Sequence, residues 1–357
     1  MERKENINMK TKGGRAWHKF RGNFTALIGL LFIAAMFMVS LLGVLIRLDK
    51  SVNANAQHLE ISKQSPGFEV DILYFGTEPE QGFASWWNGG VDDKRFSVAV
   101  SEIRFDATLK PMAYRAYGSS DWVNCSNDEV SIEHRKFYLG TDKYGRDLLS
   151  RLLAGVKISL GVGVVAVFIS LLVGLLLGLV AGYYRGWVDS LIMWFTNVVW
   201  AVPTLLLVMA ITFAFGTGLW KVFLAVGLTM WVEVARITRG QVLSVREKEY
   251  IEAARALGFN DLRIMFQHVL PNIWSPIIVI SAANFASAIL IEAGLSFLGL
   301  GAQIPVPSWG NMIREHYAFI TTDLAYLAIV PGLMIMLLVL SFMMVGNGLR
   351  DALDVKS

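Results

Sequence analysis

The chain has 357 residues, of which 54% are hydrophobic and 17% are charged, with a formal net charge of +3 and a mean hydropathy of +0.49. This apolar content exceeds what one soluble core of that length requires, so the composition excludes an ordinary soluble domain and predicts a polytopic membrane protein. The small net charge does not imply a nucleic-acid partner. The single cysteine, Cys125, excludes an internal disulfide.

The N-terminal residues 1–23 are rich in Lys and Arg and are predicted to form a cytoplasmic tail. An apolar run over residues 24–46 follows. That run is too long for a signal-peptide core and lacks a small-residue cleavage site, so we expect it to be retained as the first transmembrane helix.

Residues 47–139 are polar and are expected to form an extracytoplasmic insert of mixed or β character. Alternating apolar residues from Phe96 to Phe105 predict a strand within it. Trp86 and Trp87 fit either the core of this insert or the membrane interface, and we favour the core. The insert also contains two histidines and the cysteine, but their wide spacing matches no zinc pattern, so no metal site is expected: His58, Cys125 and His134.

Five further windows have the length and apolarity of membrane spans, which makes six in total. They cover residues 158–183, 191–215, 219–232, 276–300 and 326–346. The 158–183 window is crowded with glycines and is therefore predicted to pack closely against other helices. Pro203 removes a backbone donor from the 191–215 window and should kink it.

The short loops predict the orientation. The tail and the 233–271 loop are rich in Lys and Arg, whereas 216–218 has none and 301–323 has only Arg314. Because positive residues remain in the cytoplasm, we expect both termini there and the 47–139 insert outside.

Residues 249–260 carry the pattern of a helix, a tight turn and a second helix. The first helix has apolar residues at helical spacing: Tyr250, Ala253, Ala254 and Leu257. The second is expected to place these side chains on one face: Leu262, Met265, Phe266 and Val269. Gly258 is placed to end the first helix in a left-handed cap, Asn260 can cap the second, and Pro271 stops it. Such a hairpin fits docking into a soluble partner and lying on lipid headgroups equally well.

This stretch resembles the EAA loop of ABC-importer permeases. The resemblance rests on six residues at fixed spacing: Glu252, Ala253, Ala254, Gly258, Leu270 and Pro271. In that family the loop forms the coupling helices that fit a groove on the ATPase subunit, so these six residues are expected to couple to an ATPase. The usual isoleucine before Leu-Pro is replaced by His268.

Other stretches resemble the dipeptide and oligopeptide permeases, in particular the C-type permease of each pair. They are Leu139-Gly140-Thr141-Asp142 with Gly145-Arg146-Asp147 and Ser150-Arg151, the run from Glu292 to Gly301, and the run from Gly348 to Asp354. The resemblance implies an all-α transmembrane bundle of the type I ABC importer kind. It assigns 140–346 to the permease domain, with five helices and a coupling loop at 236–275, and 347–357 to a cytoplasmic tail. The 47–139 insert is longer than the family typically carries.

The implied function is that of a permease subunit that forms half of the pathway for peptides or related solutes. The implied partners are a second permease in a heterodimer, two ATPase subunits, an extracytoplasmic substrate-binding protein and membrane lipid, and the implied location is the inner membrane of a bacterium. Glu292, Asn284 and Pro203 are candidates for the translocation path or an outer gate, and an interfacial or capping role is the alternative for Glu292. The 148–156 segment is amphipathic, and we expect it to lie in the outer interface with Arg146, Asp147 and Arg151 facing water.

No G-x-x-x-x-G-K-[ST] phosphate loop occurs in the sequence, so the chain is not expected to bind ATP itself. No catalytic cluster, metal or cofactor is expected either. An ion-coupled secondary transporter is the alternative function, but it would show inverted repeats and mid-membrane ionisable residues. A membrane-embedded enzyme would need a His/Glu or Asp/His cluster at membrane depth.

Overall fold

The structure is a computed structural model, and it describes residues 12–79, 89–93, 95–107, 110–125, 129–216 and 218–353. Trp86, Trp87 and the first eleven residues of the tail lie outside the described residues. The chain divides into two compact units. The bundle unit comprises Met1–Met36, Ser159–Gln303 and Met334–Ser357, and the sheet unit comprises Phe37–Ile158 and Ile304–Leu333.

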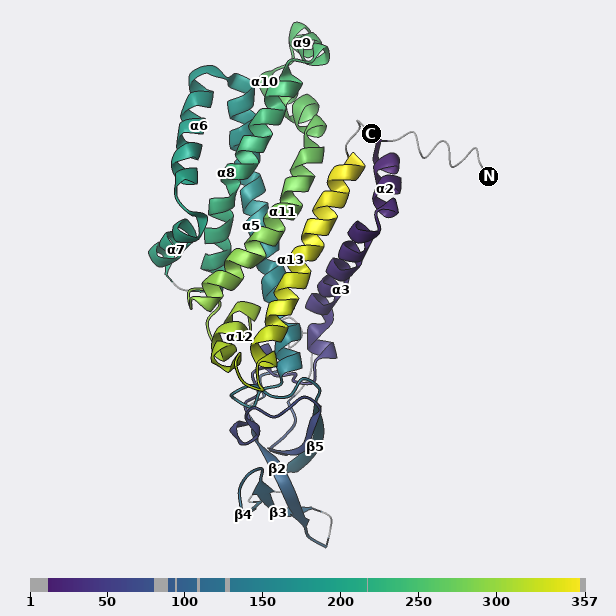
Figure 1. The fold of residues 1–357 in the computed structure, drawn as a ribbon, viewed down its shortest axis with the longest axis vertical. Helices are drawn as coiled ribbons and strands as arrows, with labels where there is room; N and C mark the ends of the chain where they lie inside the picture. The colour runs from purple at the N-terminus through teal and green to yellow at the C-terminus, as the bar shows by residue number, and fades with distance from the viewer. Residues whose placement is uncertain are drawn as a thin grey trace, which may run out of the picture. The chain divides into compact units, whose positions relative to one another are not determined.

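Helices make up the bundle unit (Figure 1). Its membrane-length and connecting helices are α2 (Lys12–Gly22), α3 (Phe24–Ile46), α5 (Leu148–Tyr184), α6 (Gly186–Ala201), α7 (Thr204–Phe215), α8 (Leu219–Arg246), α11 (Trp274–Phe297) and α13 (Tyr326–Leu353). Between α8 and α11 the chain forms α9 (Glu249–Ala256), α10 (Asp261–Arg263), η3 (Ile264–Val269) and η4 (Leu270–Asn272). The end of α3 and the starts of α5 and α13 belong to the sheet unit.

Fewer helices than the six predicted meet a test of length and apolar composition. Among the described residues, α3, α5, α11 and α13 pass, and α6 with α7 adds a fifth if the pair is one span. α8 does not pass, because Lys221, Glu233 and Arg236 place three charges in its first 18 residues. The multi-pass membrane character is therefore confirmed, and the count of spans by composition is lower than predicted.

The 191–215 window is not one kinked helix. α6 ends at Ala201, Val202 is extended, and α7 begins after Pro203 at an angle of 92° to α6. Pro203 has no N–H to continue the helical ladder and disfavours helical geometry in the residue before it, so the helix stops and restarts. Pro203 thus produces a break that is larger than the predicted kink.

The predicted close packing of the glycine-rich window is confirmed. A Cβ added to Gly174 or Gly178 of α5 would lie 2.6 Å from atoms of α8, so the two helices approach backbone to backbone. Apolar residues of α5, α7, α8 and α11 then form one core: Val162, Ala166, Val208, Val222, Ala225, Val226, Met230, Ala288 and Leu295.

The sheet unit contains a five-stranded antiparallel sheet with the order β4-β3-β2-β1-β5. Its strands are β1 (Phe68–Phe75), β2 (Phe96–Phe105), β3 (Pro111–Ala116), β4 (Trp122–Asn124) and β5 (Val130–Phe137). The predicted strand from Phe96 to Phe105 is confirmed as β2. Its Val98 pairs with Leu73 of β1, and both lie in a small core with Tyr114. The 47–139 insert therefore has the β character that its sequence predicts.

The remaining elements of the sheet unit are η1 (Val52–Ala54), η2 (Leu59–Ile61), α12 (Trp309–His316) and η5 (Tyr317–Phe319). The first turns of α5 also belong to this unit, and they are not a separate interfacial helix, because the helix runs unbroken from Leu148. Arg146, Asp147 and Arg151 are buried and do not face water as predicted. The amphipathic pattern is real, but partners within the unit cover its polar side.

Candidate functional site

The hairpin between α8 and α11, defined here as residues 249–272, begins with α9 and a sharp turn. Gly258 has φ = +76°, as the sequence predicts, and its N–H donates to the Arg255 carbonyl at 2.9 Å. The Phe259 N–H donates to the Ala254 carbonyl at 3.1 Å. This pair of bonds is a Schellman motif, which closes the end of α9 and fixes the direction of the chain that follows.

The second arm starts where predicted and then departs from an ordinary α-helix. The Asn260 side chain caps it by accepting a hydrogen bond from the Arg263 N–H at 2.8 Å. From Ile264 the backbone is a π-helix, so the spacing that grouped Leu262 and Phe266 with Met265 does not apply. Leu262 and Phe266 are exposed, and the buried residues of this arm are Ile264, Met265 and Val269. The predicted common face is therefore wrong.

The inner face of the hairpin is fixed to the bundle. Ile251 and Ala254 of α9 join an apolar cluster with Leu179 of α5 and Val242 of α8. At its edge, the Tyr183 hydroxyl of α5 donates to Asp261 Oδ1 at 2.7 Å. Both apolar and polar contacts therefore attach the base of the hairpin to α5 and α8.

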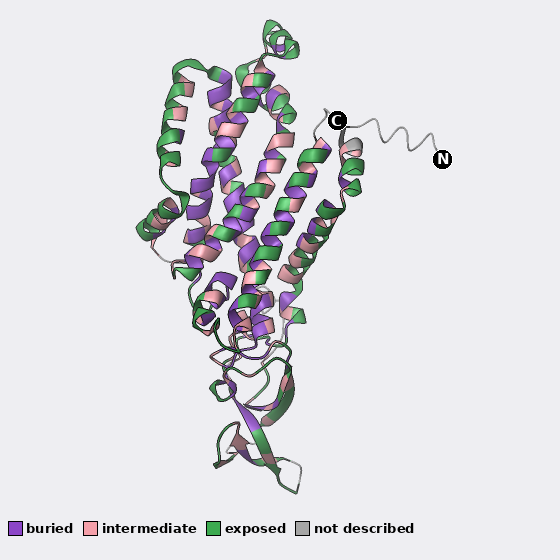
Figure 2. Cartoon of the chain, viewed as in Figure 1, coloured by how far each residue is buried: buried purple, intermediate pink, exposed green. Residues whose placement is uncertain are grey.

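The outer face of the hairpin is exposed, as Figure 2 shows for α9, and it carries both charged and apolar side chains. Its exposed hydrophobic side chains are Tyr250, Leu257, Leu262 and Phe266. Of the four α9 residues predicted to share one face, only Ala254 is buried, because the short helix meets the bundle on the side of Ile251 and Ala254. An exposed apolar cluster on a rigid base has the character of a docking surface.

The predicted coupling residues divide between these two faces. Glu252, Ala253 and Gly258 are exposed, whereas Ala254 is buried. In the second arm Leu270 packs against the inner cluster and Pro271 is exposed in η4. His268, at the unusual position before Leu270, stacks its ring on that of Phe259, with centroids 5.8 Å apart.

The predicted path residues lie elsewhere and are not brought together with the hairpin. Glu292 is fully buried in α11 and accepts a hydrogen bond from the Ser296 hydroxyl at 2.6 Å, while Ser296 accepts from the Ala302 N–H. Asn284 is also buried, two turns earlier on α11, and Pro203 lies at the break between α6 and α7. The side chains of Glu292 and Asn284 are thus covered by residues of this chain. Through Ser296, Glu292 stabilises the turn that follows α11.

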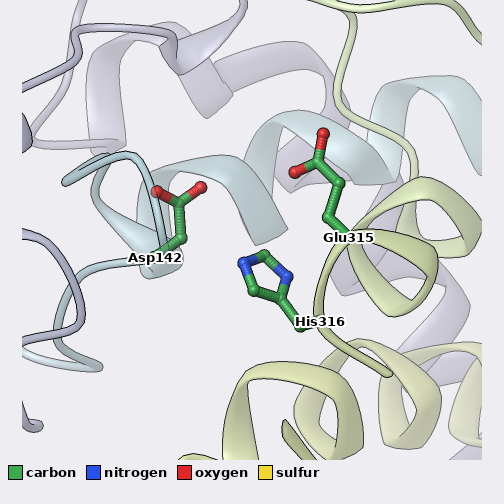
Figure 3. Close-up of side chains that lie close together, drawn as sticks. All are labelled: Asp142, Glu315 and His316. Carbon is green, nitrogen blue, oxygen red and sulfur yellow. The ribbon is translucent and has the colours of Figure 1, made fainter. Parts of the chain in front are cut away.

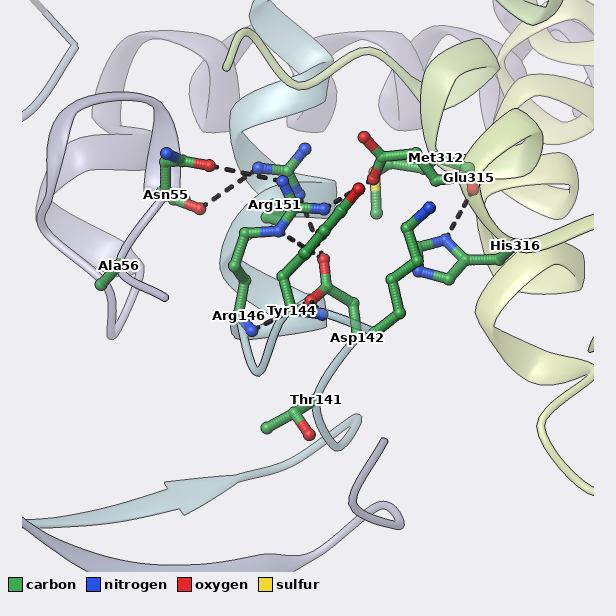
Figure 4. A network of polar contacts seen from close by, with 12 residues as sticks. Asn55, Ala56, Thr141, Asp142, Tyr144, Arg146, Arg151, Met312, Glu315 and His316 are labelled. Carbon is green, nitrogen blue, oxygen red and sulfur yellow. Dashed lines mark hydrogen bonds and ion pairs between the residues drawn. The ribbon is translucent and has the colours of Figure 1, made fainter. Parts of the chain in front are cut away.

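A buried polar network occupies the sheet unit (Figure 4). Arg146 Nε donates to Asp142 at 2.5 Å, and Arg146 Nη2 donates to Glu315 of α12 at 2.6 Å. Arg146 also donates to the Asn55 side chain at 3.3 Å. Nearby, the Trp309 Nε1–H donates to the Leu152 carbonyl at 3.0 Å. The network joins the turn before α5 to α12.

Three of these side chains have the types and spacing of metal ligands. One ligand atom from each of Asp142, Glu315 and His316 lies within 4.8 Å of the others (Figure 3). The His316 Nδ1 pairs with the Met312 carbonyl, and burial lowers the pKa of its ring. Both carboxylates are already bound by Arg146, so a divalent cation would have to displace a guanidinium from its ion pairs. The geometry favours an ion-pair network over a metal centre.

Sequence reasoning missed several residues of these sites. The Tyr183–Asp261 bond joins residues that lie 78 positions apart, and no local pattern signals it. The burial of Arg146 and Arg151 was missed because an amphipathic helix reads the same whether water or protein covers its polar side. Glu233, in the middle of α8, had a usable signal, since it is a carboxylate directly after the apolar 219–232 window.

Comparison with known families identifies the bundle. Residues 174–356 match the model of the binding-protein-dependent transport system inner membrane component. The matched segment includes the hairpin and all helices from α6 to α13.

Relatives and solved structures agree. The glutathione transport system permease protein GsiD of Escherichia coli O6:K15:H31 (strain 536 / UPEC) is 43% identical over 243 residues, which is 68% of this chain and 78% of that protein. The dipeptide transport system permease protein DppC of Alkalihalophilus pseudofirmus is 44% identical over 226 residues, covering 63% and 73%. An inward-facing structure of the MetNI methionine ABC transporter matches with a TM-score of 0.50 at 18% identity, covering 58% of this chain and 98% of that chain.

These relatives are transport permeases, which excludes the ion-coupled secondary transporter considered from the sequence. The resemblance to C-type peptide permeases and the type I importer fold are confirmed. The chain belongs to the family of binding-protein-dependent transport system inner membrane components, as a permease subunit of an ABC importer and not an enzyme.

Proposed function

We propose that this chain is one of two different permeases in an importer of short peptides or related solutes, and that the 249–272 hairpin couples it to a separate ATPase subunit. The observation that carries the proposal is the set of exposed apolar side chains on the outer face of a hairpin whose inner face is fixed to α5 and α8. A rigid base is what a coupling element requires, because motion imposed on the outer face is then transmitted to the membrane helices.

The substrate class rests on the relatives. The names of two of them specify glutathione and dipeptides, both of which are short peptides. The heterodimer rests on the resemblance to the C-type member of permease pairs. The orientation, with both termini and the hairpin in the cytoplasm and the 47–139 insert outside, rests on the Lys and Arg content of the short loops.

Co-purification of the ATPase tests the coupling. Ala253 is small and exposed beside Glu252, so Ala253→Trp would hold an ATPase groove away from the hairpin without touching the inner cluster. In cells that express the complete importer, we expect Ala253→Trp to reach the membrane at normal levels and to lose the ATPase subunit on purification. Ala253→Ser, the matched control, should retain it. ATPase that remains bound to Ala253→Trp at the normal level would contradict the proposal.

A further inference from the structure

Glu233 lies at the midpoint of α8. It is fourteen residues after Leu219 and thirteen before Arg246, so it is about 20 Å from either end of the helix at 1.5 Å per residue. α8 packs between α5 and α11, both of which are long and apolar enough to span the membrane. Because the hydrocarbon region is about 30 Å thick and the predicted 219–232 span covers only about 21 Å of helix, the residue that directly follows this span lies within reach of the bilayer.

Glu233 also lies on the one open strip of α8. Between Lys221 and Gly240, the only exposed residues are Glu233 and Gly240. The strip continues with Gln241 and Ser244 toward the hairpin. Next to this strip, Val234 and Ala235 are covered by the glycines of α5.

The strip is not suited to lipid. A charged side chain facing the middle of a bilayer costs roughly 2.5–3.5 kcal/mol on insertion scales. The exposed face of α5, in contrast, carries Phe168, Leu172 and Leu176. The Glu233 strip is small and polar, so it faces either a water-filled path or another protein.

A groove begins one turn away. A cavity of ≈ 460 Å³ is lined by Ile237 and Gln241 of α8 and by Val279 and Ala283 of α11, among others. Ile237 follows Glu233 by four residues, so the two side chains lie on the same face of the helix. The volume is in the range of small-molecule sites.

The cations near Glu233 on α8 have other partners. Arg236 lies over the Trp200 ring at 4.0 Å and donates to the Asn197 side chain, and Arg239 forms a two-bond ion pair with Asp189 at 2.5 and 2.6 Å. Within the described part of the chain, no ion pair includes Glu233. Arg350 of α13 also lines the groove, and the Glu233 carboxylate is available to a cation that enters it.

We infer that Glu233 is a specificity-determining residue of the translocation path, where its carboxylate pairs with protonated amino groups of the passing solute. This inference rests on the proposed peptide substrate. It assigns to α8 a residue that contacts cargo, in addition to the role of α8 in carrying the coupling hairpin.

Charge restoration tests the position. In a Cys125→Ser background, Glu233→Cys is assembled with the partner permease, the ATPase subunits and the binding protein in proteoliposomes, and uptake of a labelled dipeptide is measured. We expect uptake to fall about tenfold, the effect of one lost ionic contact. A sulfonate-bearing thiol reagent should restore most of it, and a trimethylammonium-bearing reagent should not. Leu172→Cys, on the apolar face of α5, should respond to neither reagent.

Substrate preference tests the chemistry. Glu233→Gln should reduce uptake of a lysine-containing dipeptide more than uptake of a glutamate-containing one, each relative to the unaltered complex. This ratio cancels any selection by the binding protein. Three outcomes would each overturn the inference. The first is an equal loss for both peptides, and the second is no response of the introduced thiol to either reagent. The third is failure of Glu233→Gln to assemble with the partner permease, which would place Glu233 in the permease interface. An unaltered complex that hydrolyses ATP but takes up no peptide would instead overturn the proposed substrate and, with it, this inference.

Discussion

Arg146 and Glu315 are 169 positions apart in the sequence and form a buried ion pair of 2.6 Å. Arg146 binds Asp142 at the same time, and Arg151 lies 3.9 Å from the same carboxylate, so two guanidinium groups balance the two carboxylates. A buried charge is tolerated only with such partners, because removal from water costs several kcal/mol per ion. The pair therefore holds α12 against the turn that precedes α5.

Arg146→Met should strongly destabilise the sheet unit, by about 3–5 kcal/mol, because Glu315 loses its guanidinium partner and Asp142 keeps only Arg151, at 3.9 Å, as a cation. Thermal unfolding of the purified chain in detergent would measure the loss. Lys136→Met removes an exposed ion pair with Glu69 at 2.7 Å and should have a much smaller effect, because water screens an exposed pair. Equal effects of the two substitutions would contradict the importance of burial.

Gly155→Ala should destabilise the same region through Trp309. A Cβ at position 155 would lie 2.8 Å from the fully buried Trp309 ring, which is held by its bond to the Leu152 carbonyl. Gly161→Ala on the same helix would meet only the Phe223 ring at 3.5 Å, an ordinary contact. Since alanine favours helix by about 1 kcal/mol over glycine, we expect Gly161→Ala to be neutral or stabilising in the same unfolding assay. An increase in the unfolding temperature of Gly155→Ala would contradict this prediction and would show that α12 can shift away from α5 at little cost.

Gly258→Val should uncouple transport while the chain still inserts. Space is open around Gly258, so the cost comes from its φ of +76°, which a β-branched residue strongly disfavours. The expected readout is normal membrane abundance with loss of stimulated ATP hydrolysis in the assembled importer. Gly258→Asn tolerates the left-handed region and should retain most of the activity. Normal coupling by Gly258→Val would mean that the Schellman turn is not needed.

Reversing charge at Glu252, an exposed residue on the same hairpin, should weaken coupling by a smaller amount, since an exposed contact is worth about 1 kcal/mol or less.

His58 should make the sheet unit less stable in acid. Burial lowers the pKa of its ring to about 4 from the ordinary 6.5, and neither ring nitrogen has a hydrogen-bond partner among the described residues. Between these two values the unfolded chain binds the proton and the folded chain does not, so stability is full above about pH 6.5 and falls as the pH drops toward 4, by about 3 kcal/mol in all. His58→Asn should flatten this dependence when unfolding is compared at pH 7.5 and pH 5. Burial raises the pKa of Asp147, an effect of opposite sign that is present in both proteins and cancels in the comparison. An identical pH slope in the variant would refute the assignment to His58.

Labelling of single cysteines should establish the orientation. In a Cys125→Ser background, an impermeant thiol reagent added to intact cells should modify a cysteine at Ser119, an exposed residue of the insert, and should not modify one at Asn260 in the hairpin. Gly90, also in the insert, is a less suitable position for a cysteine, because a Cβ there would overlap the Ser51 carbonyl oxygen. Modification of a cysteine at the Asn260 position in intact cells would show that the orientation is the reverse of the predicted one.

The sequence by itself determined the features that depend on local chemistry. Long apolar runs predict membrane helices, alternation from Phe96 to Phe105 predicts β2, and Gly258 with Asn260 predicts the ends of the hairpin helices, because capping involves only residues a few positions apart. Tertiary structure decided which faces are covered. The sequence pattern cannot distinguish water from a protein partner on the polar side of the 148–156 segment, and the burial of Arg146 depends on Glu315, which comes from a distant helix. In the hairpin, likewise, Ile251 and Ala254 contact α5 and α8 and form the inner face, whereas Tyr250 and Leu257 remain exposed. The reason is that the free energy of burying an apolar side chain depends on what packs against it and not on its spacing alone.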